Sequence, residues 1–203
     1  MNNRLPKPTE SREPTLELLA AVHQCHLCAD LPYGPRPILQ VAARARILVA
    51  SQAPGRRAHE SGIPFDDPSG DRLRNWMGLR HEEFYDPSKI AIVPMAFCFP
   101  GTGPAGDLPP RSVCAATWRQ RLLASLPAVR LTLVVGTHAL NWHLGSGCGS
   151  VTDAVSRWRT YWPELLPMPH PSPRNNRWLK QNAWFERDVI PALRSQVRRV
   201  LDT

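Results

Sequence analysis

Four of the five cysteines occur at a spacing that suits a metal centre. Cys25 and Cys28 form a C-x2-C pair, and Cys98 and Cys114 follow far downstream with fifteen residues between them. Four thiolates can bind either a [4Fe-4S] cluster or a zinc ion. A zinc ribbon more usually has two close C-x2-C pairs, so the asymmetric second pair favours the cluster. We expect these four residues to be the metal ligands and Cys148 to be a spectator.

Two polar segments follow apolar runs that are typical of buried strands. Residues 46–50 lead into residues 51–70, which carry Gln52 and Phe65, and residues 165–169 lead into His170 and Ser172. In an α/β sheet, ligands bind at the carboxyl ends of the strands. We therefore expect the two segments to face each other across one pocket.

Motifs in these two segments resemble those of the uracil-DNA glycosylase superfamily. Ala53-Pro54-Gly55, Gly62-Ile63-Pro64-Phe65 and His170-Pro171-Ser172 occur in that order and at similar spacing. Together with the cysteines they are most similar to the iron-sulfur branch, family four, whose motifs read G-E-(A/G)-P-G, G-R-P-F and H-P-S. The resemblance covers most of the chain, from Cys25 to the last helix. It implies the superfamily fold and a structural [4Fe-4S] cluster on the four cysteines.

The resemblance also implies roles for individual residues. Cleavage of an N-glycosidic bond places negative charge on the departing base, and His170 matches the histidine that donates to the base oxygen in the family. Phe65 is the expected stacking platform under a flipped base. The other expected contacts are Gln52, Ala53, Pro54, Gly55 and Pro94 around the substrate, Ser172 on a flanking phosphate, and Arg174, Arg177 and Lys180 on DNA.

Two of these positions depart from the family pattern. Gln52 stands where family four has glutamate, and an amide can orient a water molecule but cannot take its proton. The candidate replacements are the side chains of His59, Glu60, Asp66 and Asp67. Pro94 stands where the family has the asparagine that reads the uracil edge, and proline has neither a side-chain amide nor a backbone N–H. The sequence therefore does not identify which base is excised.

The distribution of apolar residues predicts an α/β fold. Strand-like runs at residues 46–50, 89–93, 129–135 and 165–168 alternate with helical patterns at 15–24, 70–77, 110–123, 138–144 and 178–201. Ser69 is the expected cap of the second helix, and the last helix is expected to be interrupted near Pro191. We expect a three-layer domain over residues 15–203, with a central, mainly parallel four-stranded sheet, preceded by a flexible arm at residues 1–14.

The composition favours an anionic partner. Lys and Arg number 25 against 17 Asp and Glu, which gives a formal net charge of +8 and a pI near 9.8. Nucleic acid is the usual partner of such a protein, although a solvated basic surface has the same composition. No run approaches the length of a membrane span, and the first residues lack the apolar core of a signal peptide. We expect a cytoplasmic monomer that binds DNA and no membrane.

The sequence thus predicts a DNA glycosylase that hydrolyses the bond to a uracil or another deaminated base in base excision repair. Neither motif contains a lysine that could form a Schiff base, so we expect a monofunctional enzyme. Three alternatives stay open: a nucleic-acid-binding homologue that lost catalysis, a glycosylase for a base other than uracil, and an RNA- or nucleotide-directed hydrolase.

Overall fold

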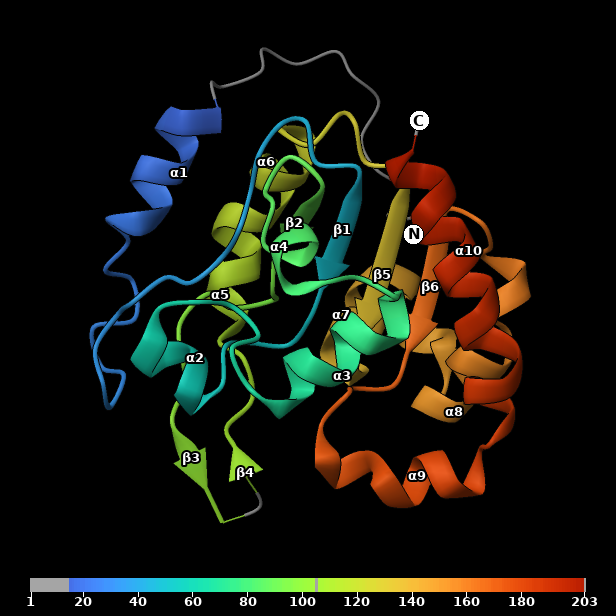
Figure 1. Ribbon diagram of the computed structural model, residues 1–203. Helices are drawn as coiled ribbons and strands as arrows, with labels where there is room; N and C mark the ends of the chain where they lie inside the picture. Colours follow the sequence, from blue (N-terminus) through green and yellow to red (C-terminus); the bar gives the residue numbers. More distant parts are fainter. Residues whose placement is uncertain (1–14, 105, 203) are drawn as a thin grey trace.

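The computed structural model describes residues 15–104 and 106–202 and contains a four-stranded sheet (Figure 1). All neighbouring strands are parallel, and their order is β2-β1-β5-β6. The strands are β1 (Ile47–Ala50), β2 (Ile90–Ile92), β5 (Leu131–Val135) and β6 (Leu165–Met168). This arrangement confirms the predicted fold class. The expected arm at residues 1–14 lies outside the described residues.

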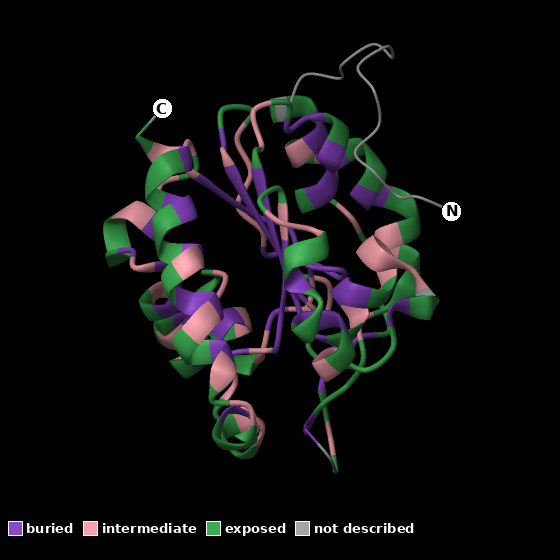
Figure 2. Cartoon of the chain, turned by 90° about the vertical axis from the view of Figure 1, so that its right-hand side faces the viewer, coloured by how far each residue is buried: buried purple, intermediate pink, exposed green. Residues whose placement is uncertain are grey.

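Helices cover both faces of the sheet, because successive residues of a strand point to opposite sides. Ile47 and Val49 of β1 pack into the cluster that includes α3 (Pro68–Met77) and α10 (Ile190–Leu201). Leu48, between them, packs with α1 (Thr15–His23) and α6 (Gln120–Ala124). Figure 2 shows the buried strands between two groups of helices whose outer faces are exposed.

Short elements form the connections. The helical ones are α2 (Arg56–Ser61), α4 (His81–Phe84), α5 (Ser112–Cys114), the π-helix η1 (Ala115–Arg119), α7 (Thr137–Leu144), η2 (Ser146–Cys148), α8 (Val151–Ser156), η3 (Trp158–Thr160), η4 (Pro173–Asn175), α9 (Asn176–Gln181) and the π-helix η5 (Phe185–Val189). Strands β3 (Thr102–Gly103) and β4 (Gly106–Asp107) form an antiparallel hairpin. None of the described helices is long and apolar enough to cross a membrane.

The capping prediction for the second helix was wrong. Helix α3 begins at Pro68, and its cap is Asp67 rather than Ser69, because the Asp67 carboxylate accepts the Gly70 N–H at 2.8 Å. Proline suits the first helical position, where its missing N–H has no intrahelical partner to lose. Asp67 therefore has a fixed orientation at the start of α3.

The interruption of the last helical segment lies earlier than expected. The chain leaves helical geometry at Asn182 and Ala183, and η5 then continues into α10 without a break. Pro191 lies in the first turn of α10, a position that tolerates proline.

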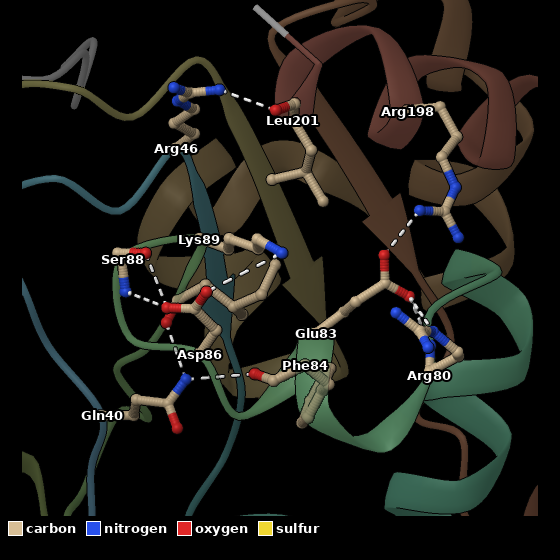
Figure 3. Close-up of polar contacts among 11 residues, drawn as sticks. Gln40, Arg46, Arg80, Glu83, Phe84, Asp86, Ser88, Lys89, Arg198 and Leu201 are labelled. Atoms are coloured by element: carbon tan, nitrogen blue, oxygen red, sulfur yellow. Dashed lines mark hydrogen bonds and ion pairs between the residues drawn. The ribbon is translucent and has the colours of Figure 1, made fainter.

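Two arginines of α10 contact other elements of the protein. Arg198 contacts the Glu83 carboxylate at 2.7 Å and the Gly78 carbonyl at 2.6 Å, and Arg194 donates to the Asn75 carbonyl at 2.9 Å. Figure 3 shows Glu83 between Arg80 and Arg198. Part of the positive charge therefore fastens α10 to α3 and α4.

Replacement of Glu83 by glutamine should lower stability by about 1.5–3 kcal/mol, the usual contribution of hydrogen bonds to a charged group. The Arg198 and Arg80 hydrogen bonds lower the pKa of Glu83 from 4.5 to about 2. Because the folded-state pKa is the lower one, the contribution is complete above pH 4.5 and is lost as the pH falls towards 2. Urea unfolding of the wild type and of the Glu83→Gln variant at several pH values across this range measures the difference in stability. A stability difference that persists unchanged at the acid end would contradict the assignment.

Candidate active site

A pocket of about 430 Å³ opens beyond the carboxyl ends of β1, β2 and β6. Its volume lies in the range of small-ligand sites. The predicted site residues that line it are Gln52, Ala53, Pro54, Gly55, Phe65, Pro94, His170, Ser172 and Arg174. The two segments expected to face each other thus meet in one pocket, as strand ends of a parallel sheet do.

The segment after β1 is tied to the segment after β2. The Ser51 carbonyl accepts the Met95 N–H at 2.8 Å, and the Gln52 carbonyl accepts the Ala96 N–H at 3.1 Å. These bonds extend the pairing of β1 and β2 past the strand ends, so that Gln52 and Pro94 both line the pocket from neighbouring segments. Neither residue supplies a carboxylate, and Pro94 supplies no donor to a base.

Phe65 has a strained backbone. Its φ is 59°, in the left-handed region that a bulky side chain rarely adopts and that costs about 1–3 kcal/mol. Arg74 donates to the Phe65 carbonyl at 3.3 Å, and Tyr85 donates to the preceding carbonyl of Pro64 at 3.0 Å. The ring lies edge-on to Phe84, with centroids 6.3 Å apart. These contacts hold an aromatic ring, half-buried, at the pocket wall.

The backbone of Phe65 also presses against α3. A Cβ at Gly70 would lie 1.8 Å from the Phe65 carbonyl oxygen, far inside contact distance. Any side chain at this position would force the Phe65 segment away from the helix. Glycine is therefore required at position 70 because the Phe65 backbone approaches α3 so closely, and not because of the φ angle of Gly70.

The ring of His170 has a defined tautomer. Its Nδ1 lies 3.2 Å from the Ser172 backbone N–H and accepts from it, so the proton of the neutral ring is on Nε2. Burial lowers the pKa of His170, and the Asp67 carboxylate opposes this shift. The neutral ring therefore offers one N–H donor to the pocket.

Arg72 of α3 holds the segment around His170. Its guanidinium donates to the Pro171 and Ser172 carbonyls, both at 3.2 Å, and to the Asn176 side chain at 2.8 Å. Asn175 donates to the His170 carbonyl at 2.7 Å. Because Arg74 of the same helix holds Phe65, α3 fixes the positions of both predicted catalytic segments.

Two carboxylates converge over Gly55 in the pocket. The position of a Gly55 Cβ would be 3.4 Å from Asp107 Oδ2 and 3.7 Å from Asp67 Oδ2. Burial raises the pKa of Asp107, and the charge of Arg174 opposes this while that of Asp67 adds to it. Of the four candidate replacements for the missing glutamate, Asp67 is the one that lines the pocket; Glu60 pairs with Arg56 on α2 at 3.1 Å.

Of the three predicted DNA-binding residues, Arg174 lines the pocket, and Arg177 and Lys180 follow it on α9. Ser172 caps η4 by accepting the Arg174 N–H at 3.3 Å. Arg174 packs on the β3–β4 hairpin, where a Cβ at Gly106 would overlap its guanidinium. Arg177 and Lys180 lie on α9, are exposed and do not line the pocket. The three cations recur every three residues and so lie along one side of a helical segment.

The four predicted cysteine ligands line a second cavity. Burial raises the pKa of Cys98 to about 11 and that of Cys114 to about 12, and the Trp118 indole N–H lies 3.3 Å from the Cys25 sulfur. Among the described residues, no three metal-binding side chains are close enough together to hold a single ion. A cubane takes one thiolate per iron, so its ligands stand farther apart than those of one zinc ion. Four thiols are a donor set that suits either a [4Fe-4S] cluster or a zinc ion.

Cys148 is not part of this cavity. It is buried, and its sulfur lies 3.5 Å from the Asn141 side-chain oxygen. Its expected role as a spectator stays a prediction.

Several residues that line or support the pocket were not identified from the sequence. Asp107 follows Gly106 in a hairpin with no recognisable motif, and Arg72 resembles any other charged residue of a helix. Asn175 had the best signal, because it follows His170 by five residues in the same segment.

The sequence was compared with models of known protein families. The model described as Uracil DNA glycosylase superfamily matches residues 39–194. The matched region contains β1, the pocket segments and helix α3, and ends within α10. It begins after Cys25 and Cys28.

Proposed function

We propose that this chain, which belongs to the uracil-DNA glycosylase superfamily, is a DNA glycosylase that hydrolyses the bond between deoxyribose and a flipped, deaminated base. The observation that carries the proposal is the meeting of Phe65 and His170 in one pocket, although more than a hundred residues separate them in the sequence. One supplies a stacking surface and the other a neutral N–H donor.

The proposed reaction starts with DNA bound at the pocket mouth. Arg174, Arg177 and Lys180 bind phosphates, and the target base leaves the stack to lie on Phe65. As the N-glycosidic bond breaks, its electron pair moves onto the base, and His170 Nε2–H donates to the base oxygen that carries the charge. Water adds to C1′ of the sugar, which makes the enzyme monofunctional.

Asp67 is the proposed acceptor for the proton of that water. Its Oδ1 is held by the Gly70 N–H, so its Oδ2 has a fixed place above Gly55. Asp107 also lines the pocket, but among the described residues no hydrogen bond anchors its carboxylate in this way. This assignment supplies the carboxylate that Gln52 does not.

Asp67→Asn should lower kcat about 100-fold, the usual contribution of a general base. Asparagine keeps the shape and remains a good N-cap, so the melting temperature should stay nearly unchanged. Single-turnover excision at saturating enzyme measures the loss, and Asp107→Asn is the matched comparison. Equal losses in the two variants would contradict the assignment of Asp67.

A [4Fe-4S] cluster on Cys25, Cys28, Cys98 and Cys114 is the second part of the proposal, and it makes the chain an iron-sulfur enzyme of the family-four type. Bound there, the cluster would crosslink the segment after α1 to the Cys98 segment and α5. Its role would be structural and not catalytic, because the cysteines line a cavity separate from the pocket that contains His170.

Purified protein should contain about four irons and four sulfides per chain, since that is the composition of the cubane. Cys114→Ser should lose most of both, whereas Cys148→Ser should keep them. Iron and acid-labile sulfide assays give the answer. A content of one zinc per chain, without iron, would show that the site holds the alternative metal and not the cluster.

The activity itself is tested by strand cleavage after alkali treatment. Single- and double-stranded oligonucleotides carrying uracil or hypoxanthine are incubated with the wild type and with His170→Ala. We expect cleavage at one of these bases that the variant loses. No cleavage at any lesion, by protein that binds DNA and holds its metal, would contradict the proposal.

A binding protein without catalysis is the second candidate. The observation in its favour is the pocket wall, where Pro94 offers no group that reads a base and Gln52 no proton acceptor. This candidate predicts tight binding to DNA with an abasic site and no excision. The strand-cleavage assay separates the two.

A further inference from the structure

Arg119 is a buried cation that the proposed reaction does not use. Its side chain lies in η1 and is 0% exposed. Nη1 donates to the carbonyls of Val93 at 2.8 Å and Pro94 at 3.0 Å, and Nη2 lies 2.8 Å from His143 Nε2. The guanidinium carbon lies 4.7 Å from the centre of the Trp142 ring, and Nε has no hydrogen-bond partner among the described residues.

None of these partners carries negative charge. Burial and the Arg119 charge hold the pKa of His143 well below its usual range, so its ring is neutral and accepts through Nε2. In the described part of the chain, no carboxylate pairs with Arg119. A buried charge without a counter-charge costs several kcal/mol, so such a cation calls for an anion nearby.

The position of Arg119 identifies the available anion. Cys114 directly precedes η1, and Arg119 ends it. On the other side, the Val93 and Pro94 carbonyls begin the short segment that continues to Cys98. Arg119 therefore lies five residues from Cys114 along one helical segment, and its guanidinium binds the segment that leads from the pocket wall to Cys98.

We infer that Arg119 is the buried counter-charge of the metal centre held by Cys25, Cys28, Cys98 and Cys114. The inference rests on the cysteine centre of the proposed function. Four thiolates outweigh the dipositive charge of either an oxidised cubane or a zinc ion, so the filled centre is negative. A buried guanidinium stabilises that charge and is stabilised by it, because the surroundings screen both weakly.

The same side chain ties the centre to the active pocket. Its bond to the Pro94 carbonyl fixes the pocket wall, and proline gives that wall no N–H with which to anchor itself. Arg119 is thus a positioning residue that joins the two cavities.

The test compares Arg119→Met with Arg121→Met in protein purified with its metal. Arg121 lies two positions further on, over the Trp118 ring, and is exposed. Transfer of iron, or of zinc, to a chelator is followed well below the melting temperature. We expect about tenfold faster release from Arg119→Met and a change within about twofold for Arg121→Met, because solvent screens an exposed charge. Arg119→Gln, which keeps a donor but not the charge, should also release metal faster.

Thermal unfolding with and without the metal separates charge from structure. Loss of the counter-charge lowers the melting temperature of the metal-bound form more than that of the metal-free form. An equal drop in both forms, or unchanged release from Arg119→Met and Arg119→Gln, would reduce Arg119 to a cap for the end of β2 and overturn the inference. Wild-type protein without iron or zinc would overturn it together with the cysteine centre, while the strand-cleavage assay would still decide base excision.

Discussion

His170→Ala should lower kcat for base excision by about 100- to 1,000-fold, the loss expected when one preorganised donor to a developing anion is removed. The ring accepts the Ser172 N–H at Nδ1 and so keeps its proton on Nε2, where the base oxygen needs it. DNA affinity should change little, because the phosphate contacts lie on other side chains. Single-turnover excision and a binding titration measure the two quantities.

The pH dependence gives this prediction a second readout. Burial lowers the pKa of His170 below 6.5, so the neutral ring persists through neutral and mildly acidic pH. Protonation would replace the acceptor lone pair at Nδ1 by a second N–H that faces the Ser172 N–H. We therefore expect the excision rate to be flat around pH 7 and to fall only at acid pH. A variant that keeps more than about a tenth of the wild-type rate would contradict the role of His170.

Gly70→Ala should lower excision about 10- to 100-fold by displacing Phe65, since stacking on an aromatic side chain contributes about 1–3 kcal/mol per base. The new Cβ would meet the Phe65 carbonyl oxygen at 1.8 Å and its Cβ at 2.9 Å. Helix propensity alone predicts the opposite, because alanine stabilises a helix interior by about 1 kcal/mol over glycine. The excision rates of Gly70→Ala and of Phe65→Ala should be lowered by similar factors.

Gly147→Ala is the matched control. Among the residues that the structure describes, its Cβ would meet nothing within 4 Å, so the same substitution introduces no clash with them. We expect wild-type activity from this variant. Full activity in Gly70→Ala would show that Phe65 is not held by α3 or is not needed.

The strands and the two pocket segments were predictable because their signals are local. Each strand is a short apolar run next to turn residues, and the motifs around Phe65 and His170 lie directly after such runs. Parallel strands end at the same edge, so the sequence was enough to expect one pocket.

The residues that hold the site were not predictable in this way. Arg72 and Arg74 bind carbonyls of two separate segments, Gly70 is required by a contact five residues away, and Arg119 by carbonyls some twenty-five residues away. Their roles depend on tertiary packing, for which one sequence carries no periodic signal. The cap of α3 was misassigned for a related reason, since Asp67 and Ser69 are both good caps and only the path of the chain selects between them.

Detection of the free base is the most direct test of the central claim. An oligonucleotide with a single uracil or hypoxanthine is incubated with the wild type and with His170→Ala, and the small-molecule fraction and the strand are both analysed by mass spectrometry without alkali. The account predicts release of the free base and an intact strand with an abasic site from the wild type alone. A strand broken without alkali, or no free base from any lesion while DNA is bound, would contradict it.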